Sequence, residues 1–430
     1  METVESINSE KPRFAGFAAR WAEILNSVIF WGLMVVIVVT LIPYGTVDAW
    51  WQALFECAVF ALTAVWLCET LLRGEWQVKR LSILLPLVLI TAYAFIQTIN
   101  WPPPWFGNHG VVPRTLTIDR YQTYLTARKT LSLTLFLGLL LVHTSTPKRL
   151  HWLVRLVVGL GLTSALFALL RQALQSPDST IGFGLPFLFY GVGYGQFISP
   201  NVFAYLMEMV FGLMAGLILG GGIRRNTVLI SLTVALIVWT ALVLSNSRGG
   251  VLGFACQNIF LISVSLTWYS ARRFSDNESA SPAWLSFIQT SKLVRVLVVV
   301  LIVGTLFVGV LWLGGDRLAT KLYEQDSGDV TIDGTTRKEI WQSTWTLIKH
   351  HPWTGVGFGA YFLAIPEYQI GSGRLKVEQA HNDYLDLVAN GGIIAVILAA
   401  WFFGLIIWRA RSSLRSVCTV SSTSLCKSLV

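Results

Sequence analysis

Three side chains of this chain combine residue types and positions that suit chemistry on a charged substrate. Arg248 lies in the run Ser245–Gly250 (SNSRGG) between two apolar segments, Arg337 opens a predicted helix, and His381 precedes the last apolar segment. An arginine offers phosphate a planar fork of donors, and a helix N-terminus also favours anions. A histidine could accept a proton near neutral pH. The three residues therefore predict anion binding and a proton transfer.

Each of these residues also has a purely structural interpretation. Arg248 could extend from a membrane helix to the surface, although the two glycines that follow it favour a tight turn that can approach a ligand. Arg337 could be a solvated helix residue, and His381 could cap a helix end. Asn382 or Asp383 could orient the His381 ring, and Asn382 is included among the predicted substrate-binding residues.

A metal centre is the main competing chemistry. The histidines that could bind a metal on the same side are His109, His350, His351 and His381. The chain has no HExxH motif, no histidine pair four residues apart and no carboxylate cluster. His350 and His351 precede Pro352 at a predicted helix end, where a histidine often bonds to loose carbonyl groups. The sequence predicts no metal and no cofactor.

Nucleotide chemistry is disfavoured by the context of the glycine-rich run. Gly355–Tyr361 (GVGFGAY) superficially resembles a nucleotide-binding loop, but it follows a predicted helix and a proline instead of a strand. We interpret it as a turn.

The composition indicates which elements must position these residues. Hydrophobic residues make up 54% of the 430 residues and charged residues only 13%, where soluble domains have about 25% charged residues. A chain this apolar requires lipid as its solvent. The formal net charge of +9 is not arranged as a basic stripe interleaved with aromatic residues, which argues against nucleic-acid binding.

The sequence predicts an all-α integral membrane protein with about ten transmembrane helices, because about 20 apolar residues in a helix cross a bilayer. The fourth segment contains Arg128 and Lys129 in its first turns. The predicted spans are Ser27–Pro43, Trp51–Leu72, Leu81–Ile99, Leu125–His143, Trp152–Leu170, Val202–Leu219, Thr227–Leu244, Val251–Tyr269, Val294–Leu313 and Gly392–Trp408.

Basic residues concentrate in alternate short loops, which predicts that both termini are cytoplasmic. Residues 1–313 then hold nine helices, residues 314–391 form a large periplasmic loop, residues 392–408 form the last helix, and residues 409–430 form a cytoplasmic tail that is rich in Ser and Thr and predicted to be disordered.

The large loop contains two predicted helices. Arg337–His350 has apolar residues near helical spacing, namely Ile340, Trp341, Trp345 and Ile348. A second helix is predicted to start near Glu378 and to continue toward the last span.

With these motifs in order, the chain resembles the superfamily of O-antigen ligases and O-antigen polymerases over roughly residues 81–408. The resemblance depends on four runs that follow one another in family order, with the long outer loop in the family position. They are SPNVFAYLMEM (Ser199–Met209), SNSRGGVLG (Ser245–Gly253), TRKEIWQSTWTLIKHHPWTGVGFGAY (Thr336–Tyr361) and AHNDYLDLVANGGIIA (Ala380–Ala395).

The resemblance implies a lipid-donor glycosyltransferase fold (GT-C-like) in the cell inner membrane, acting in lipopolysaccharide biosynthesis. It implies a glycan donor on undecaprenyl pyrophosphate, and an acceptor hydroxyl on lipid A core or another glycan, without metal or nucleotide. Arg248 and Arg337 align with the arginines that hold the donor pyrophosphate. His381 aligns with the histidine that acts as base for the acceptor hydroxyl.

Three alternatives remain open from the sequence. Ala395 stands where a ligase pattern often has Gly, Thr or Tyr, so a polymerase of the same superfamily is possible. A transporter is a second alternative, although charged residues within the spans are sparse, with Glu69 and Glu208 as the main cases. A scaffold for polysaccharide export without enzymatic activity is the third.

Overall fold

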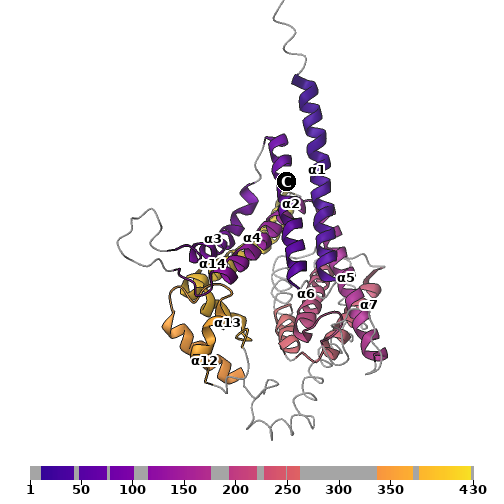
Figure 1. The fold of residues 1–430 in the computed structure, drawn as a ribbon. Helices are drawn as coiled ribbons and strands as arrows, with labels where there is room; N and C mark the ends of the chain where they lie inside the picture. Colours follow the sequence, from indigo (N-terminus) through magenta and orange to yellow (C-terminus); the bar gives the residue numbers. More distant parts are fainter. Residues whose placement is uncertain are drawn as a thin grey trace, which may run out of the picture. The chain divides into compact units, whose positions relative to one another are not determined.

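The computed structural model describes residues 11–42, 48–74, 78–100, 115–175, 193–219, 227–247, 249–261, 337–370 and 377–427. Within these ranges every element is a helix, apart from one isolated bridge between Tyr194 and Phe197 (Figure 1). The chain divides into two compact units. Unit 1 is Met1–Leu33, Gln52–Ser145 and Thr320–Val417, and unit 2 is Met34–Trp51, Thr146–Ala319 and Cys418–Val430.

Six of the described helices are long and apolar enough to cross a membrane, as expected for a multi-pass helical membrane protein. They overlap six of the predicted spans. Three further predicted spans correspond to shorter apolar helices, and the predicted span Val294–Leu313 lies outside the described residues. The six are Phe17–Leu41, Ala49–Arg73, Arg120–His143, Pro147–Leu174, Pro200–Ile218 and Asp383–Ser412, and the shorter three are Leu81–Gln97, Leu229–Leu244 and Gly249–Leu261.

The first helices of the chain begin and end where local chemistry predicts. Helix α1 (Lys11–Leu41) stops shortly before Pro43, and α2 (Ala49–Arg73) ends at Gly74, whose φ of +69° suits a glycine after a helix. A 3₁₀ turn, η1 (Val78–Leu84), leads into α3 (Leu85–Gln97), which has a proline in its first turn. Helix α4 (Arg120–His143) is capped by Asp119, whose carboxylate accepts two backbone N–H groups.

Two ion pairs show that α2 and α4 run in the same direction. Near their starts, Arg128 Nε lies 2.5 Å from Glu56 Oε2, and near their ends, His143 Nε2 lies 3.0 Å from Glu69 Oε2. The first pair explains how α4 tolerates an arginine in an apolar helix, because the buried Glu56 carboxylate neutralises it. The predicted fourth span is therefore confirmed as an apolar helix of membrane-spanning length, with a counter-charge that the sequence did not reveal.

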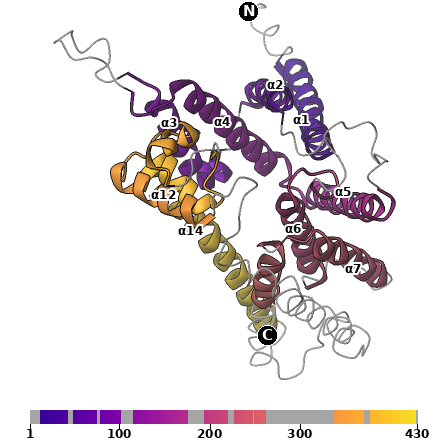
Figure 2. The same ribbon diagram turned by 60° about the horizontal axis from the view of Figure 1, so that its bottom comes forward.

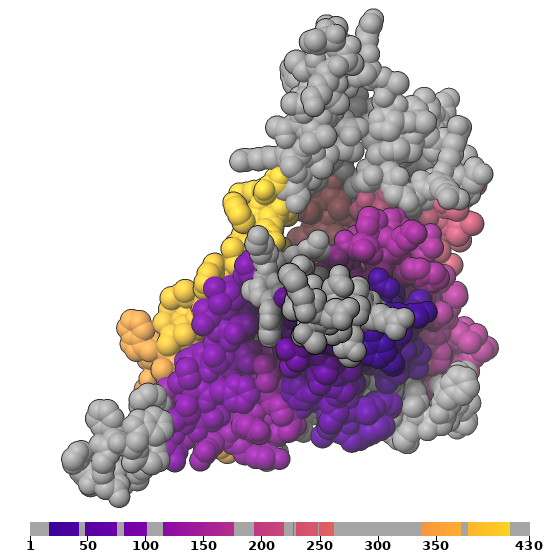
Figure 3. Space-filling model, turned by 90° about the horizontal axis from the view of Figure 1, so that it is seen from above, coloured from indigo at the N-terminus to yellow at the C-terminus, as the bar shows by residue number. Residues whose placement is uncertain are grey.

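Helix α3 packs against α4 and runs in the opposite direction. The two ends of unit 1 differ in what lies there. We name them the loop end, which contacts the segment 337–393, and the basic end, which holds Arg409. At the loop end, Gln97 contacts residues of the 337–393 segment. At the basic end, Arg409 Nη2 donates to Ser82 Oγ at 2.9 Å. About 19 residues of helix separate Asn390 from Arg409, or roughly 28 Å at 1.5 Å per residue, which matches a bilayer core. The yellow and orange residues of α14 and α12 lie beside the purple residues of α3 and α4 (Figure 3).

The described part of the predicted outer loop forms a small helical subdomain. Helix α12 (Arg337–His350) has the predicted bounds, and it packs with α13 (Tyr361–Ala364) and η5 (Ile365–Tyr368). Figure 2 shows α12 beside α14. The predicted apolar face was wrong in part. Ile340 and Ile348 are buried, but Trp341 and Trp345 are 41% and 53% exposed, because the buried stripe follows Ser343, Thr344 and Leu347 instead.

Helix α14 (Asp383–Lys427) corrects two predictions. It starts five residues after Glu378, because Asn382 caps it, accepting from Tyr384 N and Leu385 N at 3.1 and 3.3 Å. Its backbone is helical to Lys427, so the predicted disorder after Arg409 is wrong. No Gly or Pro interrupts the chain after Gly404. The helix is broken at Gly392 (φ 62°, ψ −164°), the first residue of the predicted last span.

Unit 2 is built around α5 (Pro147–Leu174), α6 (Pro200–Leu219), α7 (Val228–Leu244) and the helix Gly249–Leu261. Its core is apolar, with Phe203, Met207 and Phe254 fully buried. A glycine lets α5 approach α6 closely, since a Cβ on Gly161 would lie within 2.3 Å of the Val210 side chain. In this unit α7 ends just before Ser245–Ser247, and the helix Gly249–Leu261 begins two residues after Ser247.

Candidate active site

His381 occupies a backbone conformation that few residues with a side chain adopt. Its φ is 51°, in the left-handed region, and apart from Asn246 it is the only non-glycine residue with positive φ among the described residues. This conformation costs about 1–2 kcal/mol for a residue with a Cβ, so the surrounding structure must impose it. The His381 side chain is exposed. Strain of this kind often accompanies a functional role.

Three contacts on the neighbouring residues impose this conformation. The Ala380 N–H donates to Asp386 Oδ1 at 3.2 Å, and the Ala380 carbonyl accepts from Trp341 Nε1 at 3.0 Å. On the other side, Asn382 is fixed as the helix cap. The backbone on both sides of His381 is therefore held, and the imidazole projects from a fixed point at the N-terminus of α14.

Asn382 uses its side-chain oxygen to cap α14, as described above, and it does not orient the imidazole through that atom. Asp383 is exposed in the first turn of the same helix. The carboxylate that interacts electrostatically with His381 belongs to Asp386, a residue that sequence reasoning missed. Asn382 and Asp386 are four positions apart, so they are neighbours on one face at the start of the helix. This spacing could have indicated from the sequence that Asp386 lies near His381.

Arg337 begins α12, the helix that contacts the residue before His381. Arg337 and Trp341 are four positions apart on α12, so they are neighbours on one helix face. The Trp341 indole donates to the Ala380 carbonyl, which joins this helix to the segment that carries His381. Arg337 is exposed, and the N-terminus of a helix favours an anion.

The glycine-rich run Gly355–Tyr361 forms a turn, as the sequence predicted. This turn is hydrogen-bonded to α14. Val356 N and Gly357 N donate to the carbonyls of Ala389 and Asn390, each at 2.9 Å. The Asn390 side-chain oxygen accepts from Gly359 N and Tyr361 N at 3.1 and 3.2 Å. These bonds join the turn to the first half of α14.

Gln97 ties the same turn to α3. Its Nε2 donates to the Thr354 carbonyl at 2.8 Å, and its Oε1 accepts from Phe358 N at 3.1 Å. Gln97 is fully buried, so both bonds are formed away from solvent. The loop subdomain is thereby anchored to the apolar helices of unit 1.

Two glycines of this region have no substitute. Gly357 has φ 107°, and a Cβ there would lie 1.9 Å from Thr117 Oγ1. At Gly392 (φ 62°) a Cβ would lie 2.2 Å from the Trp353 carbonyl oxygen. Both positions require positive φ and close backbone approach, which only glycine provides.

A buried tyrosine packs in the core beneath these residues. Burial raises the pKa of Tyr361 to about 12, partly offset by its hydrogen bond with Thr344, whose hydroxyl oxygen lies 2.6 Å away. Tyr361 is therefore a neutral packing residue at physiological pH.

His350 has a structural contact at the end of α12. Its Nδ1 bonds to the Thr346 carbonyl at 2.9 Å, as predicted for a histidine at a helix end.

Arg248 itself lies outside the described residues, as do His109, Thr336 and residues 314–335. Its neighbours form a helix–turn–helix junction in unit 2. Ser247 Oγ accepts from Gly250 N at 3.0 Å, and its hydroxyl donates to Asn201 Oδ1 at 2.6 Å. The Ser247 side chain thus caps the helix Gly249–Leu261.

The two glycines after Arg248 differ in role. A Cβ on Gly250 would lie 2.4 Å from Ala204 Cβ, so Gly250 allows close helix packing and does not face a ligand. A Cβ on Gly249 would meet nothing closer than 3.9 Å, which leaves open space at that position. The prediction that both glycines serve ligand approach is therefore wrong for Gly250.

Within the part of the chain that the structure describes, no group of three His, Cys, Asp or Glu residues lies close enough to hold a metal ion. The available chemistry there consists of an exposed imidazole, an arginine and a helix N-terminus. This set can accept a proton and bind an anion.

One comparison with known proteins gives a match. Residues 232–400 match the family model described as O-antigen ligase. No curated protein and no solved structure matches the chain. The matched segment includes the SNSRGG run, α12 and the turn that carries His381. Over residues 232–400 the chain is therefore similar to the O-antigen ligase family, which supports the resemblance that its motifs indicated.

Proposed function

We propose that this protein transfers a glycan from an undecaprenyl-pyrophosphate-linked donor to an acceptor hydroxyl on the periplasmic side of the cell inner membrane. The observation that carries the proposal is His381, an exposed histidine in a left-handed conformation that three flanking contacts impose. The family match supports glycan transfer as the general activity.

In the proposed reaction, the acceptor oxygen attacks the anomeric carbon of the donor sugar as the bond from that carbon to the pyrophosphate oxygen breaks. His381 accepts the proton of the acceptor hydroxyl. The pyrophosphate leaves with the bonding electrons, and the negative charge that develops on it is stabilised by Arg337 and Arg248. These cations supply the electrostatic role that a metal would otherwise fill.

The surroundings of the arginines favour this assignment. Arg337 begins α12, and Arg248 adjoins the capped start of the helix Gly249–Leu261. Helix N-termini present unpaired N–H groups and a positive dipole end to an anion. Asn382 keeps its amide nitrogen for a substrate hydroxyl while its oxygen caps α14.

The proposal includes ten membrane spans with both termini in the cytoplasm, in a lipid-donor glycosyltransferase fold. Its support is the alternation of directions in unit 1, where α2, α4 and α14 run from the loop end to the basic end and α3 runs back. The sequence places Arg73, Lys79, Arg80, Lys148 and Arg409 at or next to the basic end.

The test uses the purified protein in detergent with an undecaprenyl-pyrophosphate glycan, a lipid A core acceptor and EDTA. We expect product on the acceptor, with free undecaprenyl pyrophosphate released. Arg337→Gln should lower kcat/KM about 100-fold, the usual effect of losing one charge-stabilising donor. Lys338→Gln, which removes an adjacent exposed charge on α12, is the matched control and should change it little.

The products separate the branches of the superfamily. Glycan joined to lipid A core indicates a ligase, and glycan joined to a second donor-linked glycan indicates a polymerase. No transfer to either acceptor, or equal effects of Arg337→Gln and Lys338→Gln, contradicts the proposal.

A further inference from the structure

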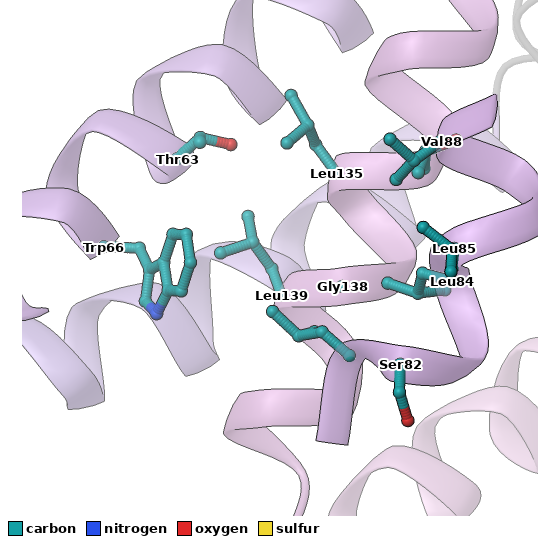
Figure 4. A pocket seen from close by; sticks show the side chains of 11 residues that line it. Thr63, Trp66, Ser82, Leu84, Leu85, Val88, Leu135, Gly138 and Leu139 are labelled. Atoms are coloured by element: carbon teal, nitrogen blue, oxygen red, sulfur yellow. The ribbon is translucent and has the colours of Figure 1, made fainter. Parts of the chain in front are cut away.

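Unit 1 contains an apolar cavity at its basic end, distant from His381. The cavity has a volume of about 330 Å³ and opens between α2, α4 and the junction of η1 with α3 (Figure 4). Trp66 and Thr63 line one side, and Ser82 and Val88 lie on the other. Leu85 and Val88 are 47% and 48% exposed, so the cavity opens at the exposed surface of these apolar helices.

The lining of the cavity is mostly apolar, so it suits a hydrocarbon chain and has few polar groups to bind a sugar. The Thr63 hydroxyl donates to the Val59 carbonyl and the Thr134 hydroxyl donates to the Thr130 carbonyl, both at 2.8 Å. Their hydrogen bonds are thus satisfied within their own helices. An apolar cavity of this kind stays dry and takes up apolar ligands. Gly138 leaves the space open, because its missing side chain would point toward Leu84.

A cation is held at the edge of the cavity. Ser82, which lines the cavity, accepts a hydrogen bond from Arg409 Nη2 at 2.9 Å. The guanidinium is exposed and has five N–H donors in a planar fork that suits a phosphate. An apolar groove with an arginine at its edge complements an acyl chain joined to an anionic head group.

The position of the cavity distinguishes this ligand from the glycan donor. Ser82 and Gln97 lie at opposite ends of the η1–α3 segment, roughly 22 Å apart at 1.5 Å per residue. Gln97 contacts the turn beside α14, whereas Ser82 lies at the basic end. The head group at Arg409 would therefore lie in the leaflet opposite the one that faces His381.

We propose that this cavity is a binding site for an anionic diacyl phospholipid, with one acyl chain in the cavity and its phosphate at Arg409 and Ser82. Basic sites between membrane helices commonly bind anionic lipid head groups, and this one adds an apolar slot for the chain. The bound lipid would fill the space between α2, α3 and α4 at the end where no loop subdomain braces them.

The test measures the phospholipid retained by the full-length protein in detergent, by native mass spectrometry after addition of phosphatidylglycerol or phosphatidylcholine with the same acyl chains. We expect the wild type to retain phosphatidylglycerol at least fivefold better. Arg409→Gln should abolish that preference, and Gly138→Leu should reduce retention of both lipids by filling the cavity.

Two variants on α14 serve as matched controls. Arg411→Gln removes an exposed arginine two positions away, and Gly404→Leu adds the same side chain where no atom lies within 4 Å. Neither should alter retention. The proposal is overturned if the wild type retains both lipids equally, if Arg409→Gln and Arg411→Gln behave alike, or if only an undecaprenyl chain occupies the cavity.

Discussion

Two histidines of unit 1 stand in opposite environments. His143, the last residue of α4, is buried, with Nδ1 3.0 Å from the Leu139 carbonyl oxygen and Nε2 3.0 Å from Glu69 Oε2. His381 is exposed, and its imidazole makes no hydrogen bond to another described residue. One ring is fully engaged within the protein, while the other is held by its backbone and left available.

The contacts of His143 link three helices. Its Nε2 lies beside Oε2 of Glu69, and the other oxygen of Glu69 accepts from Asn26 Nδ2 at 2.7 Å and lies 2.8 Å from Arg73 Nε. The group therefore joins α1, α2 and α4.

In this fold, the histidine that stabilises the structure and the histidine that is available to a substrate are different residues. The buried histidine contributes an internal contact, and its ring has no atom left for a substrate. At His381 the backbone adopts an unfavourable conformation, which costs about 1–2 kcal/mol, and the ring is left without a hydrogen bond to a described residue. The comparison therefore predicts opposite consequences for substitutions at the two positions.

The largest expected effect is on glycan transfer by His381→Ala. Loss of a general base lowers the rate about 10²- to 10⁴-fold. The His381 side chain is exposed and unbonded, so the thermal unfolding of the variant in detergent should match that of the wild type. The measurement is single-turnover transfer with the purified protein.

His143→Ala is the matched control for that measurement. We expect transfer by the folded fraction to stay within about fivefold of wild type, since no ring atom of His143 is available to substrate. Equal losses of transfer in both variants would mean that the environments of the two histidines do not separate their roles.

The second effect is on stability at the buried group. Glu69→Leu should lower the free energy of unfolding by about 3–5 kcal/mol, because it removes the buried carboxylate that Asn26, Arg73 and His143 share. The double variant Glu69→Leu/His143→Leu should recover part of this loss, because the buried imidazole that has lost its partner is then removed as well. Unfolding of each variant in detergent gives the coupling energy. Strictly additive losses would contradict the ion pair.

A smaller effect on stability is expected at Gln97, which is hydrogen-bonded to the glycine-rich turn. Gln97→Leu leaves the partly buried Phe358 N–H without its partner and removes one donor to the Thr354 carbonyl, at a cost of about 1–3 kcal/mol. Transfer should fall with it, since the turn supports α14. Tyr93→Phe, which removes only the other donor to Thr354, should cost less than half as much. A larger loss of stability in Tyr93→Phe than in Gln97→Leu would mean that Gln97 is not the main residue that holds the turn.

The sequence predicted much of this fold because hydropathy and helix periodicity are local signals. Most apolar spans and the bounds of α12 follow from such patterns. Contacts between distant segments do not. The Trp341–Ala380 bond joins residues 39 positions apart, and Glu56 was missed as the partner of Arg128 because nothing local marks it. The left-handed conformation of His381 depends on such contacts, so its residue type was predictable and its geometry was not.

The smallest expected effect is on the free energy of unfolding, which should not fall when His381 is replaced by glycine, whereas it should fall when His143 is replaced. His381→Gly removes the imidazole together with the Cβ that makes φ 51° unfavourable. Relief of that strain opposes the greater entropy of glycine in the unfolded chain, about 0.4–1 kcal/mol, so stability should be unchanged or rise by up to about 1 kcal/mol. Transfer should be lost as in His381→Ala. A fall in stability of more than about 1 kcal/mol would show that the His381 side chain packs as His143 does, because only lost side-chain contacts could outweigh the relieved strain.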